Sequence, residues 1–308
     1  MGPILRSKRY FTSLVLKAYQ EPGGAEHDLI KRKAREWIGL DRNLRSPRTR
    51  KRFIHYTLKA ARQLALQSSN PELGTHPIGS DDLVVECYKT DTNTAAIFLF
   101  GFSDNIRFFD FYREHLRPGH TAIDVGANVG MHTLVMSRLV GPQGEVISYE
   151  PAKTIFQRLK HNIKINEAGN VIPLDFAVGA GKGFAGFTDL SHETNIAKSH
   201  VDPLSNQKVS MTTLDLEHHG SKRVGLIKID VEGGELDVLK GARKILEDHR
   251  PVVFMEFNVQ DYSLGEIIEN IPDKYHILGV PVTYYETEKL IPTNAGEPGF
   301  HNIAIIPD

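Results

Sequence analysis

From residue 121 onward, short apolar runs alternate with amphipathic helical patterns, and this alternation constrains the fold more than any other feature of the chain. The apolar runs, which we expect to be strands, are 121–125, 145–150, 171–178, 224–230 and 251–256. The helical patterns are 131–140, 152–167, 235–248 and 263–270. Strands that alternate with helices form parallel βαβ units. The sequence therefore predicts an α/β fold, a Rossmann-like, mostly parallel sheet with helices on both faces.

Further apolar segments flank this alternation. Residues 208–215 predict an extra strand before the fourth unit, and 275–280, 282–287 and 301–307 predict two or three closing strands, some of them antiparallel. In an open sheet of this type the ligand binds outside the carboxyl ends of the strands. Polar residues that end strands are therefore the first candidates for a site.

The first 80 residues differ from the rest of the chain. Residues 28–38 and 49–67 have helix-forming composition with apolar residues three to four apart, and 68–80 collect Ser, Asn, Pro and Gly as a linker does. We therefore divide the chain into a helical N-terminal extension with a linker, 1–80, and an α/β domain, 81–308.

The start of the α/β domain predicts a hairpin. Residues 82–90 and 95–101 are apolar runs typical of strands, with a turn at 91–93 between them. Residues 105–117 predict a helix that Pro118 and Gly119 end.

Charge is distributed unevenly. Residues 1–60 hold fifteen of the 37 Lys and Arg residues but only five of the 38 Asp and Glu residues, so a segment of net charge +10 precedes a body of net charge −11. A solvated arm, an arm docked on the acidic body, peripheral contact with an anionic membrane and a transit peptide at 1–20 all stay open. Nucleic acid is disfavoured, because the body that would carry the chemistry is acidic.

The cysteine count and the hydropathy of the chain limit the expected cellular location. The single cysteine, Cys87, excludes an intramolecular disulfide framework and a thiolate metal cluster. The sequence contains no apolar run of about 18 residues, so it predicts no membrane-spanning helix. We expect a cytoplasmic protein, with membrane association or organelle targeting through residues 1–20 left open. The sequence carries no signature of the oligomeric state.

The run TAIDVGANVG, residues 121–130, places a glycine turn directly after a predicted strand. Strand, glycine turn and helix together form an anion or cofactor site. The dinucleotide fingerprint would need glycines at 126, 128 and 131, but Asn128 and Met131 replace two of them. An asparagine side chain would occupy the space that a pyrophosphate needs. The turn therefore favours a cofactor without phosphates, for which we take S-adenosyl-L-methionine; a tight βα connection in an unrelated protein is the alternative.

Polar side chains at the strand ends match parts of that cofactor. Asp124 could serve its cationic end, and Asn128 could hydrogen-bond the methionine portion. Gly126 and Gly130 would let the backbone pass closely. Glu150 could accept both ribose hydroxyls, as an acid does in dinucleotide folds, or could serve the start of the next helix; both roles are compatible.

The third predicted strand ends near the adenine. Asp175 could accept the exocyclic amine, while Phe176 or Ala177 packs nearby. His132, just past the turn, is expected to pack at the start of its helix.

The run VGLIKIDVEGGELDVLKG, residues 224–241, is the predicted site of the chemistry. Lys228 and Asp230 point to one face of a strand, because side chains two apart share a face. Asp230 ends that strand and could anchor the methionine end or face the acceptor. Glu232, in the following turn, is a candidate base or acceptor-positioning group. The alternative is that these acids cap the next helix.

Six blocks of the sequence resemble the FkbM family of S-adenosylmethionine-dependent methyltransferases. They are IDVGANVGMHT, SYEPAKTIFQRLKHNIKIN, PLDFAVG, MTTLDL, IKIDVEGGELDVLKGA and RPVVFMEFN, within roughly residues 100–260. The resemblance implies a class I methyltransferase fold of seven strands with an antiparallel seventh. It also implies methyl transfer, usually to a hydroxyl of a sugar or natural product. By position, the cofactor residues are Asp124, Gly126, Asn128, Gly130, Glu150, Asp175 and Ala177.

Two alternatives to this function stay open. The acceptor could be a protein or RNA, or the chain could be a non-catalytic adenosyl-binding protein on the same fold. Some O-methyltransferases of this fold bind magnesium through acids at strand ends, and Asp230, Glu256 and Asn258 are oxygen ligands of that type. Their spacing does not copy that motif, and we expect no metal.

Overall fold

The computed structural model describes residues 17, 24–25, 27–30, 32, 72–78, 82–89, 91–100, 108–190, 199–217, 222–258, 261–281, 291–292 and 300–308. The chain divides into two compact units. One comprises residues 1–106 with 190–197, and the other comprises 107–189 with 198–308. The second, larger unit contains the predicted alternation of strands and helices.

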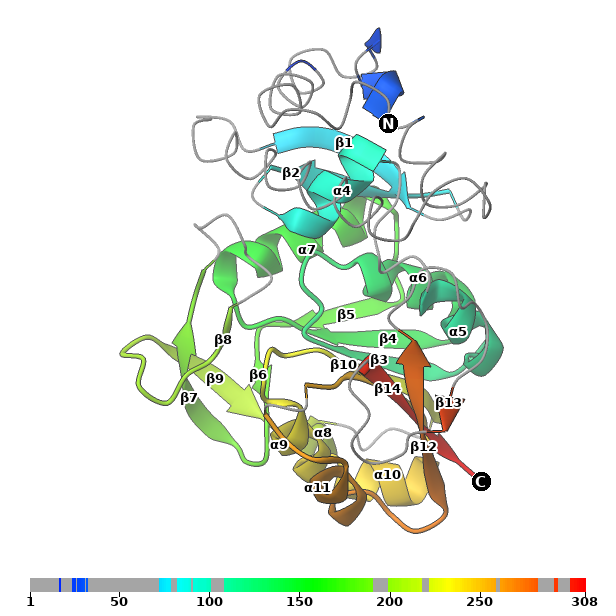
Figure 1. Cartoon of the computed structure of the whole chain (residues 1–308), viewed down its shortest axis with the longest axis vertical. Helices are drawn as coiled ribbons and strands as arrows, with labels where there is room; N and C mark the ends of the chain where they lie inside the picture. The colour runs from blue at the N-terminus through cyan, green and yellow to red at the C-terminus, as the bar shows by residue number, and fades with distance from the viewer. Residues whose placement is uncertain are drawn as a thin grey trace, which may run out of the picture. The chain divides into compact units, whose positions relative to one another are not determined.

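The larger unit is built on a sheet that has eight strands within the described residues, in the order β13-β12-β14-β11-β10-β3-β4-β5 (Figure 1). Five neighbours run parallel: β5 (Val171–Leu174), β4 (Glu145–Tyr149), β3 (Thr121–Val125), β10 (Val224–Ile229) and β11 (Val252–Glu256). The remaining strands are antiparallel to their neighbours: β14 (Phe300–Pro307), β12 (Tyr275–Pro281) and β13 (Ile291–Pro292). The predicted class I sheet is confirmed, with β14 as its antiparallel strand and the two-residue β13 added at the edge.

Helices cover both faces of this sheet (Figure 1). One face carries α5 (Phe108–His115), α6 (Met131–Val140) and α7 (Lys153–Ile165). The other carries α9 (Glu235–Lys240), α10 (Arg243–His249) and α11 (Leu264–Glu269). The predicted helix 235–248 is thus two helices, which Gly241 and Ala242 separate.

The α9–α11 face of the sheet is an apolar core. Its fully buried members include Ile123, Val125, Ile227, Ile229 and Val253 from the strands and Val238, Leu239, Ile245 and Leu246 from the helices. Burying each such side chain contributes about 1.5–3 kcal/mol. This core anchors the central strands, so their carboxyl ends have a fixed position.

A second sheet of four described strands belongs to the same unit, in the order β6-β9-β7-β8. Its strands are β6 (Ala177–Val178), β9 (Lys208–Thr212), β7 (Gly183–Thr188) and β8 (His200–Val201). The predicted strand 171–178 is wrong as one element, because β5 pairs with β4 whereas β6 pairs with β9. The predicted strand 208–215 ends at Thr212, and α8 (Leu214–Glu217) follows it.

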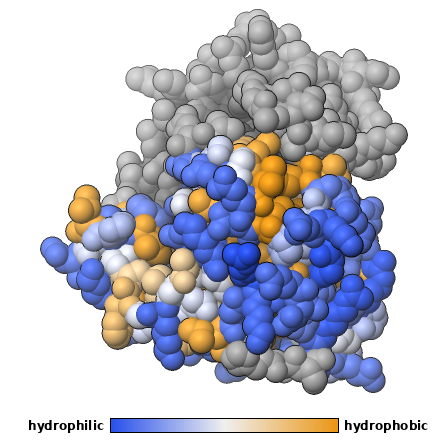
Figure 2. Space-filling model, turned by 90° about the horizontal axis from the view of Figure 1, so that it is seen from below, coloured by the Kyte–Doolittle hydropathy of each residue, from blue (hydrophilic) through white to orange (hydrophobic). Residues whose placement is uncertain are grey.

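The surface of the described residues is mixed. Figure 2 shows a mainly hydrophilic face with separate hydrophobic areas. The large apolar side chains that are exposed include Phe184 in β7 and Leu204, which follows β8, with 76% and 91% of their surface accessible. Isolated apolar side chains on a surface are common and need no partner.

The smaller unit contains a hairpin followed by a helix. β1 (Glu72–Ile78) pairs antiparallel with β2 (Leu83–Tyr88), and α4 (Thr92–Phe100) follows. The hairpin is therefore formed by β1 and β2, and residues 91–93, predicted as its turn, instead lead into α4. The predicted linker at 68–80 contains a strand.

The predicted strand at 95–101 is wrong because Asp91 starts a helix there. Its carboxylate accepts the backbone N–H groups of Asn93 and Thr94 at 3.0 and 3.3 Å. These are two of the N–H groups that the first turn of a helix leaves without backbone acceptors. The apolar run then becomes α4, whose residues 95–99 are buried.

Several predicted elements lie outside the described residues. These are the helix at 49–67, the strand at 282–287, most of the helix at 28–38 and nearly all of the basic segment 1–60. In the part of the chain that the structure describes, no helix combines the length and the apolar character needed to cross a membrane.

Candidate functional site

Polar residues at the carboxyl ends of the central strands share one face of the sheet. Asp124 of β3 is opposite Lys228 of β10 and Ser148 of β4. Residues paired in this way point to the same face, and so do residues two apart along a strand. Glu150 and Asp230, one residue beyond their strands, continue this face. It is the face that α5 and α6 cover, opposite the apolar core.

The backbone N–H groups of the glycine turn, residues 126–130, are all hydrogen-bonded within the protein. The five donors and their acceptors are Gly126 and Ala127 to the Tyr149 carbonyl (3.0 and 2.9 Å), Asn128 to Glu150 Oε2 (3.0 Å), Val129 to Asn128 Oδ1 (2.7 Å) and Gly130 to the Ala127 carbonyl (2.9 Å). A phosphate site needs such N–H groups to point at the ligand. The turn is therefore not arranged to cradle a pyrophosphate.

At both glycines of the turn, the surrounding protein leaves no room for a Cβ. Gly126 has a φ of 76°, and a Cβ there would collide with the backbone carbonyl of Asp230. Gly130 has a φ of 94°, and a Cβ there would lie 2.7 Å from Leu159 Cδ1. The sequence explained these glycines by close passage of the backbone to a cofactor, which stays a prediction. The contact of Gly126 with the turn that begins at Asp230 is an additional reason for a glycine.

Asn128 adopts the left-handed conformation with a φ of 50°, which Asn tolerates better than most residues. Its side-chain oxygen accepts the Val129 N–H, so that oxygen shapes the turn. The side-chain nitrogen and the second lone pair of that oxygen stay available for the predicted contact with a methionine portion.

Glu150 is buried against the glycine turn. Its Oε2 accepts the Asn128 N–H at 3.0 Å, and its Oε1 accepts the Ala152 N–H at 2.9 Å. Burial raises the pKa of Glu150 to about 7, although these two hydrogen bonds and Lys228 oppose the shift. A carboxylate oxygen can accept more than one hydrogen bond, so both predicted roles, toward a ribose diol and at the start of α7, are compatible with this geometry.

Asp124 is fully buried at the end of β3. Its Oδ2 accepts a hydrogen bond from the Thr133 hydroxyl at 2.6 Å. Its Oδ1 makes no hydrogen bond but lies 3.3 Å from the Lys228 ammonium. The sequence placed Lys228 on the face of Asp230 without giving it a role, and it did not identify Thr133, because the contact crosses a turn whose path only the structure shows.

The two residues predicted to lie near the adenine differ in solvent exposure. Asp175 is exposed directly after β5, and Ala177 is buried in β6. The Glu150 N–H donates to the Leu174 carbonyl at 3.0 Å, which keeps the ends of β4 and β5 together. Asp175 therefore directly follows the strand end next to Glu150, and its contact with an adenine stays a prediction.

Three carboxyl groups converge beside the glycine turn. One oxygen each from Asp230, Glu232 and Glu256 lies within 4.8 Å of the others. Burial, followed by the charges of Asp230, Glu232 and Glu235, raises the pKa of Glu256 to about 8. Such a cluster retains a proton near neutral pH. The sequence noted Glu256 only as a strand end and a metal ligand.

The helix-capping role that the sequence left open for Asp230 and Glu232 is not filled, because α9 has no side-chain cap. The turn before α9 is held instead by Glu235, the first residue of that helix. Its Oε1 accepts the N–H groups of Val231 and Gly233, both at 3.1 Å. The Tyr262 hydroxyl lies 3.2 Å from its Oε2. Glu232 has a φ of 57° within the turn that Glu235 holds.

The acid cluster is also a set of hard oxygen ligands. Asn258, the third ligand considered from the sequence, instead donates to Asp261 Oδ2 at 2.8 Å. The absence of a metal requirement stays a prediction that chelation can test.

His132 packs at the start of α6, as predicted, and is 6% exposed. Its Nδ1 is hydrogen-bonded to the Tyr112 hydroxyl at 2.8 Å. Burial is the main reason that the pKa of His132 is lowered to about 4. His132 is therefore neutral at physiological pH.

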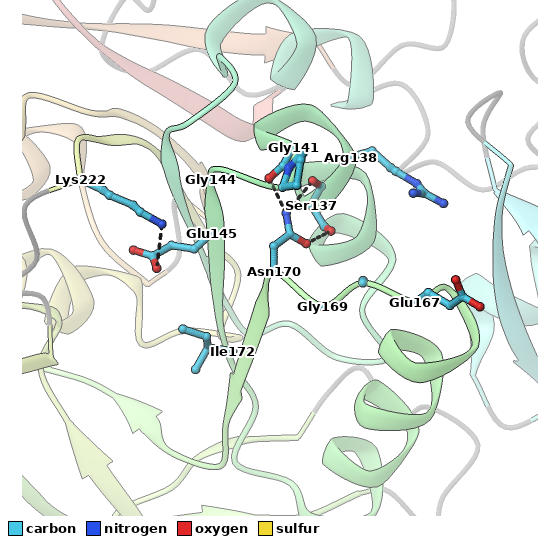
Figure 3. A pocket seen from close by; sticks show the side chains of 12 residues that line it. Ser137, Arg138, Gly141, Gly144, Glu145, Glu167, Gly169, Asn170, Ile172 and Lys222 are labelled. Atoms are coloured by element: carbon cyan, nitrogen blue, oxygen red, sulfur yellow. Dashed lines mark hydrogen bonds and ion pairs between the residues drawn. The ribbon is translucent and has the colours of Figure 1, made fainter.

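A pocket of about 600 Å³ lies at the amino ends of the parallel strands, opposite the carboxyl ends where the predicted site is (Figure 3). Glu145 and Asn170, which line it, stand at the amino ends of β4 and β5. Asn170 donates to the carbonyls of Ser137 and Gly141, and Lys222 lies 3.6 Å from Glu145. Because these polar groups pair with one another and lie away from the carboxyl ends, this pocket is not the predicted cofactor site.

Comparison with known proteins identifies relatives of this chain. The family model "Methyltransferase FkbM domain" matches residues 124–277, half of the chain. A hexuronic acid methyltransferase, AglP, of Haloferax volcanii is 31% identical over 40% of this chain and 50% of its own length. The 31-O-demethyl-FK506 methyltransferase FkbM of Streptomyces tacrolimicus is 27% identical over 50% of this chain and 71% of its own length.

Among solved structures, the methyltransferase FkbM of Methylobacillus flagellatus aligns with a TM-score of 0.41 and 16% identity, covering 81% of this chain and 59% of that one. The chain spans about half to three fifths of the length of the first curated relatives that it matches.

Proposed function

Because the chain belongs to the FkbM family of S-adenosylmethionine-dependent methyltransferases, we propose that it methylates a hydroxyl group of a sugar or small natural product. The observation that carries the proposal is the contact between the glycine turn and the acid cluster. Gly126 packs against the Asp230 carbonyl, so a donor held at the turn would lie beside the three carboxyl groups.

The glycine turn and the neighbouring strand ends would hold the donor. Asp124 would attract its ammonium group, Glu150 would accept the ribose hydroxyls, and Asp175 would accept the adenine amine. The first turn of α6 has no side-chain cap, so its N–H groups are suited to the donor's carboxylate. None of these contacts needs a phosphate.

The acid cluster would serve the acceptor. The bound donor supplies a methyl carbon activated by its sulfonium. As the acceptor oxygen bonds to that carbon, the carbon–sulfur bond breaks, its electron pair stays on sulfur, and the hydroxyl proton must leave. Glu256 or a neighbour could take this proton, because a base works best when its pKa lies near the operating pH.

The acceptor class rests on the relatives. The names of two of them state a hexuronic acid and the O-demethyl form of a natural product as substrates. Both are small molecules, and both fit a site in which carboxyl groups handle a hydroxyl proton. The same acids would disfavour RNA, whose phosphates they repel.

The experiment has two stages. Calorimetry with S-adenosylhomocysteine tests the donor site, and tritiated S-adenosylmethionine then reports methyl transfer to hexuronic acids, hydroxylated natural products, proteins and RNA. We expect binding and base-stable label on a sugar or small molecule. Label on protein or RNA alone would refute the proposed acceptor, and binding without any transfer would indicate a non-catalytic adenosyl-binding protein.

Asp230→Asn provides the catalytic control. It keeps the size of the side chain, and we expect it to abolish turnover while S-adenosylhomocysteine still binds. Full activity of this variant would remove Asp230 from the chemistry.

A further inference from the structure

Lys228 is a cation buried beneath the proposed site. Its side chain is 3% exposed, and its Nζ lies 3.3 Å from Asp124 Oδ1 and 3.5 Å from Asp230 Oδ2. The same ammonium donates to the Gly126 carbonyl at 2.7 Å and lies 3.4 Å from the Val125 carbonyl. A buried charge is costly unless its partners compensate for it, and these four oxygens do so.

The partners of Lys228 lie at the end of β3 and in the two turns that follow β3 and β10. Val125 and Gly126 lead into the glycine turn, and Asp230 begins the turn of the acid cluster. Asp230 is 45% exposed, so Lys228 connects a buried carboxylate to one that solvent or a ligand can reach. The ammonium therefore ties the end of β3 to the end of β10 at the point where the two turns touch.

Lys228 also determines how the Asp124 carboxylate is held. Thr133 fixes Oδ2, but Oδ1 makes no hydrogen bond and has the Lys228 ammonium as its neighbour. Burial lowers the pKa of Lys228, but the charges of Asp124 and Asp230 outweigh burial, and the net shift is upward. Lys228 is therefore charged at neutral pH.

We propose that Lys228 is a positioning residue of the cofactor site: its ammonium fixes the Asp124 carboxylate and the start of the glycine turn in the arrangement that receives the amino-acid end of S-adenosylmethionine. Lys228 does not touch the donor and acts through Asp124. The inference rests on the proposed cofactor role of Asp124.

A double-mutant cycle on donor-site binding tests the proposal. Calorimetry would measure the affinity of S-adenosylhomocysteine for wild type, Lys228→Met, Asp124→Asn and the double variant. We expect each single change to weaken binding about tenfold, and the double variant to bind no more weakly than Asp124→Asn, because residues that act as one unit are not additive. A residue that only stabilised the fold would lower the melting temperature without changing the affinity of the folded protein.

Lys240→Met is the matched control. Lys240 lies on α9, is 43% exposed and pairs with Asp237 on the same helix, so its loss should leave the affinity unchanged. If Lys228→Met does not fold, Lys228→Gln replaces it in the cycle, since glutamine keeps a donor for the Gly126 carbonyl but carries no charge.

The outcomes separate the two proposals. Wild-type affinity in Asp124→Asn would refute the cofactor role of Asp124. Weakened binding in Asp124→Asn with wild-type affinity in the Lys228 variant would refute only the role of Lys228. A double variant about a hundredfold weaker than wild type would show independent effects and would also refute action through Asp124.

Discussion

Gly126 shows how one missing Cβ lets two turns meet. Its φ of 76° is unfavourable for other residues, and any Cβ would collide with the Asp230 carbonyl. Gly141 has a similar φ of 67°, but a Cβ there would meet nothing within 4 Å. A substitution at Gly141 therefore measures backbone strain alone, whereas one at Gly126 measures strain together with the contact between the two turns.

We expect Gly126→Ala to destabilise the protein by about 3 kcal/mol, and Gly141→Ala by about 1 kcal/mol, because the first adds overpacking to strain. Urea unfolding would measure both. Equal losses would mean that the glycine turn and the Asp230 turn can separate without cost.

Glu150 is expected to carry much of the donor affinity. Glu150→Ala should weaken S-adenosylhomocysteine binding about 10- to 100-fold, on the order of a lost pair of charge-assisted hydrogen bonds. Glu145→Ala is the control, since Glu145 begins the strand that Glu150 follows and lies at the opposite edge of the sheet. Unchanged affinity in Glu150→Ala would remove this residue from the ribose.

Glu256 should make stability depend on pH. Its pKa is raised from the ordinary 4.5 to about 8 in the folded state. The folded protein then binds this proton more tightly than the unfolded chain does, so the contribution to stability is present at low pH and is lost as pH rises toward 8. Glu150 acts in the same direction up to about 7.

We therefore expect the free energy of unfolding of wild type to fall between about pH 5 and about pH 8, and Glu256→Gln to fall less over that interval. Urea titrations at several pH values check this. Parallel curves for the two proteins would show that Glu256 titrates near its ordinary pKa.

At the scale of elements, α4 illustrates how a cap overrides a strand-like composition. Asp91 is 1% exposed and accepts two N–H groups of the first turn. Asp91→Ala should destabilise α4 by about 1–2 kcal/mol, whereas Asp91→Asn, which can still accept a hydrogen bond, should cost less. Hydrogen exchange of the amides of residues 92–100 measures the effect, and equal exchange in both variants would contradict it.

The central strands show how one element serves two purposes. Their residues on the α9–α11 face are apolar and form the core, whereas Asp124, Ser148 and Lys228 alternate with them on the other face. The strands of a parallel sheet covered on both faces are usually apolar throughout. The polar row therefore marks the part of the sheet that supports the site.

At the scale of the whole molecule, the basic N-terminal segment is expected to be separable from donor binding. Deleting residues 1–60 should leave S-adenosylhomocysteine affinity unchanged, because every proposed donor contact lies between residues 124 and 177. Calorimetry on the truncated chain checks this, with the full chain as control. Loss of folding would instead show that the segment belongs to a core.

The sequence by itself determined the sheet and placed the proposed site at the carboxyl ends of its parallel strands. Periodicity identified the five parallel strands because buried parallel strands are apolar, and the glycine turn identified the carboxyl edge because few residues fit left-handed positions. Local composition failed at α4 and at residues 171–178, where a cap and a change of strand partner decided the outcome.

Only the tertiary structure decided which acids do what. Glu232, Glu235 and Glu256 look alike in the sequence. In the structure, Glu235 accepts two N–H groups of the preceding turn, whereas burial and neighbouring acids raise the pKa of Glu256. Lys228 became a partner of Asp124 across 104 residues of chain through strand pairing. The physical reason is that hydrogen bonds and charge–charge interactions act over a few ångströms in space, and strand pairing, not distance along the chain, determines which groups come that close.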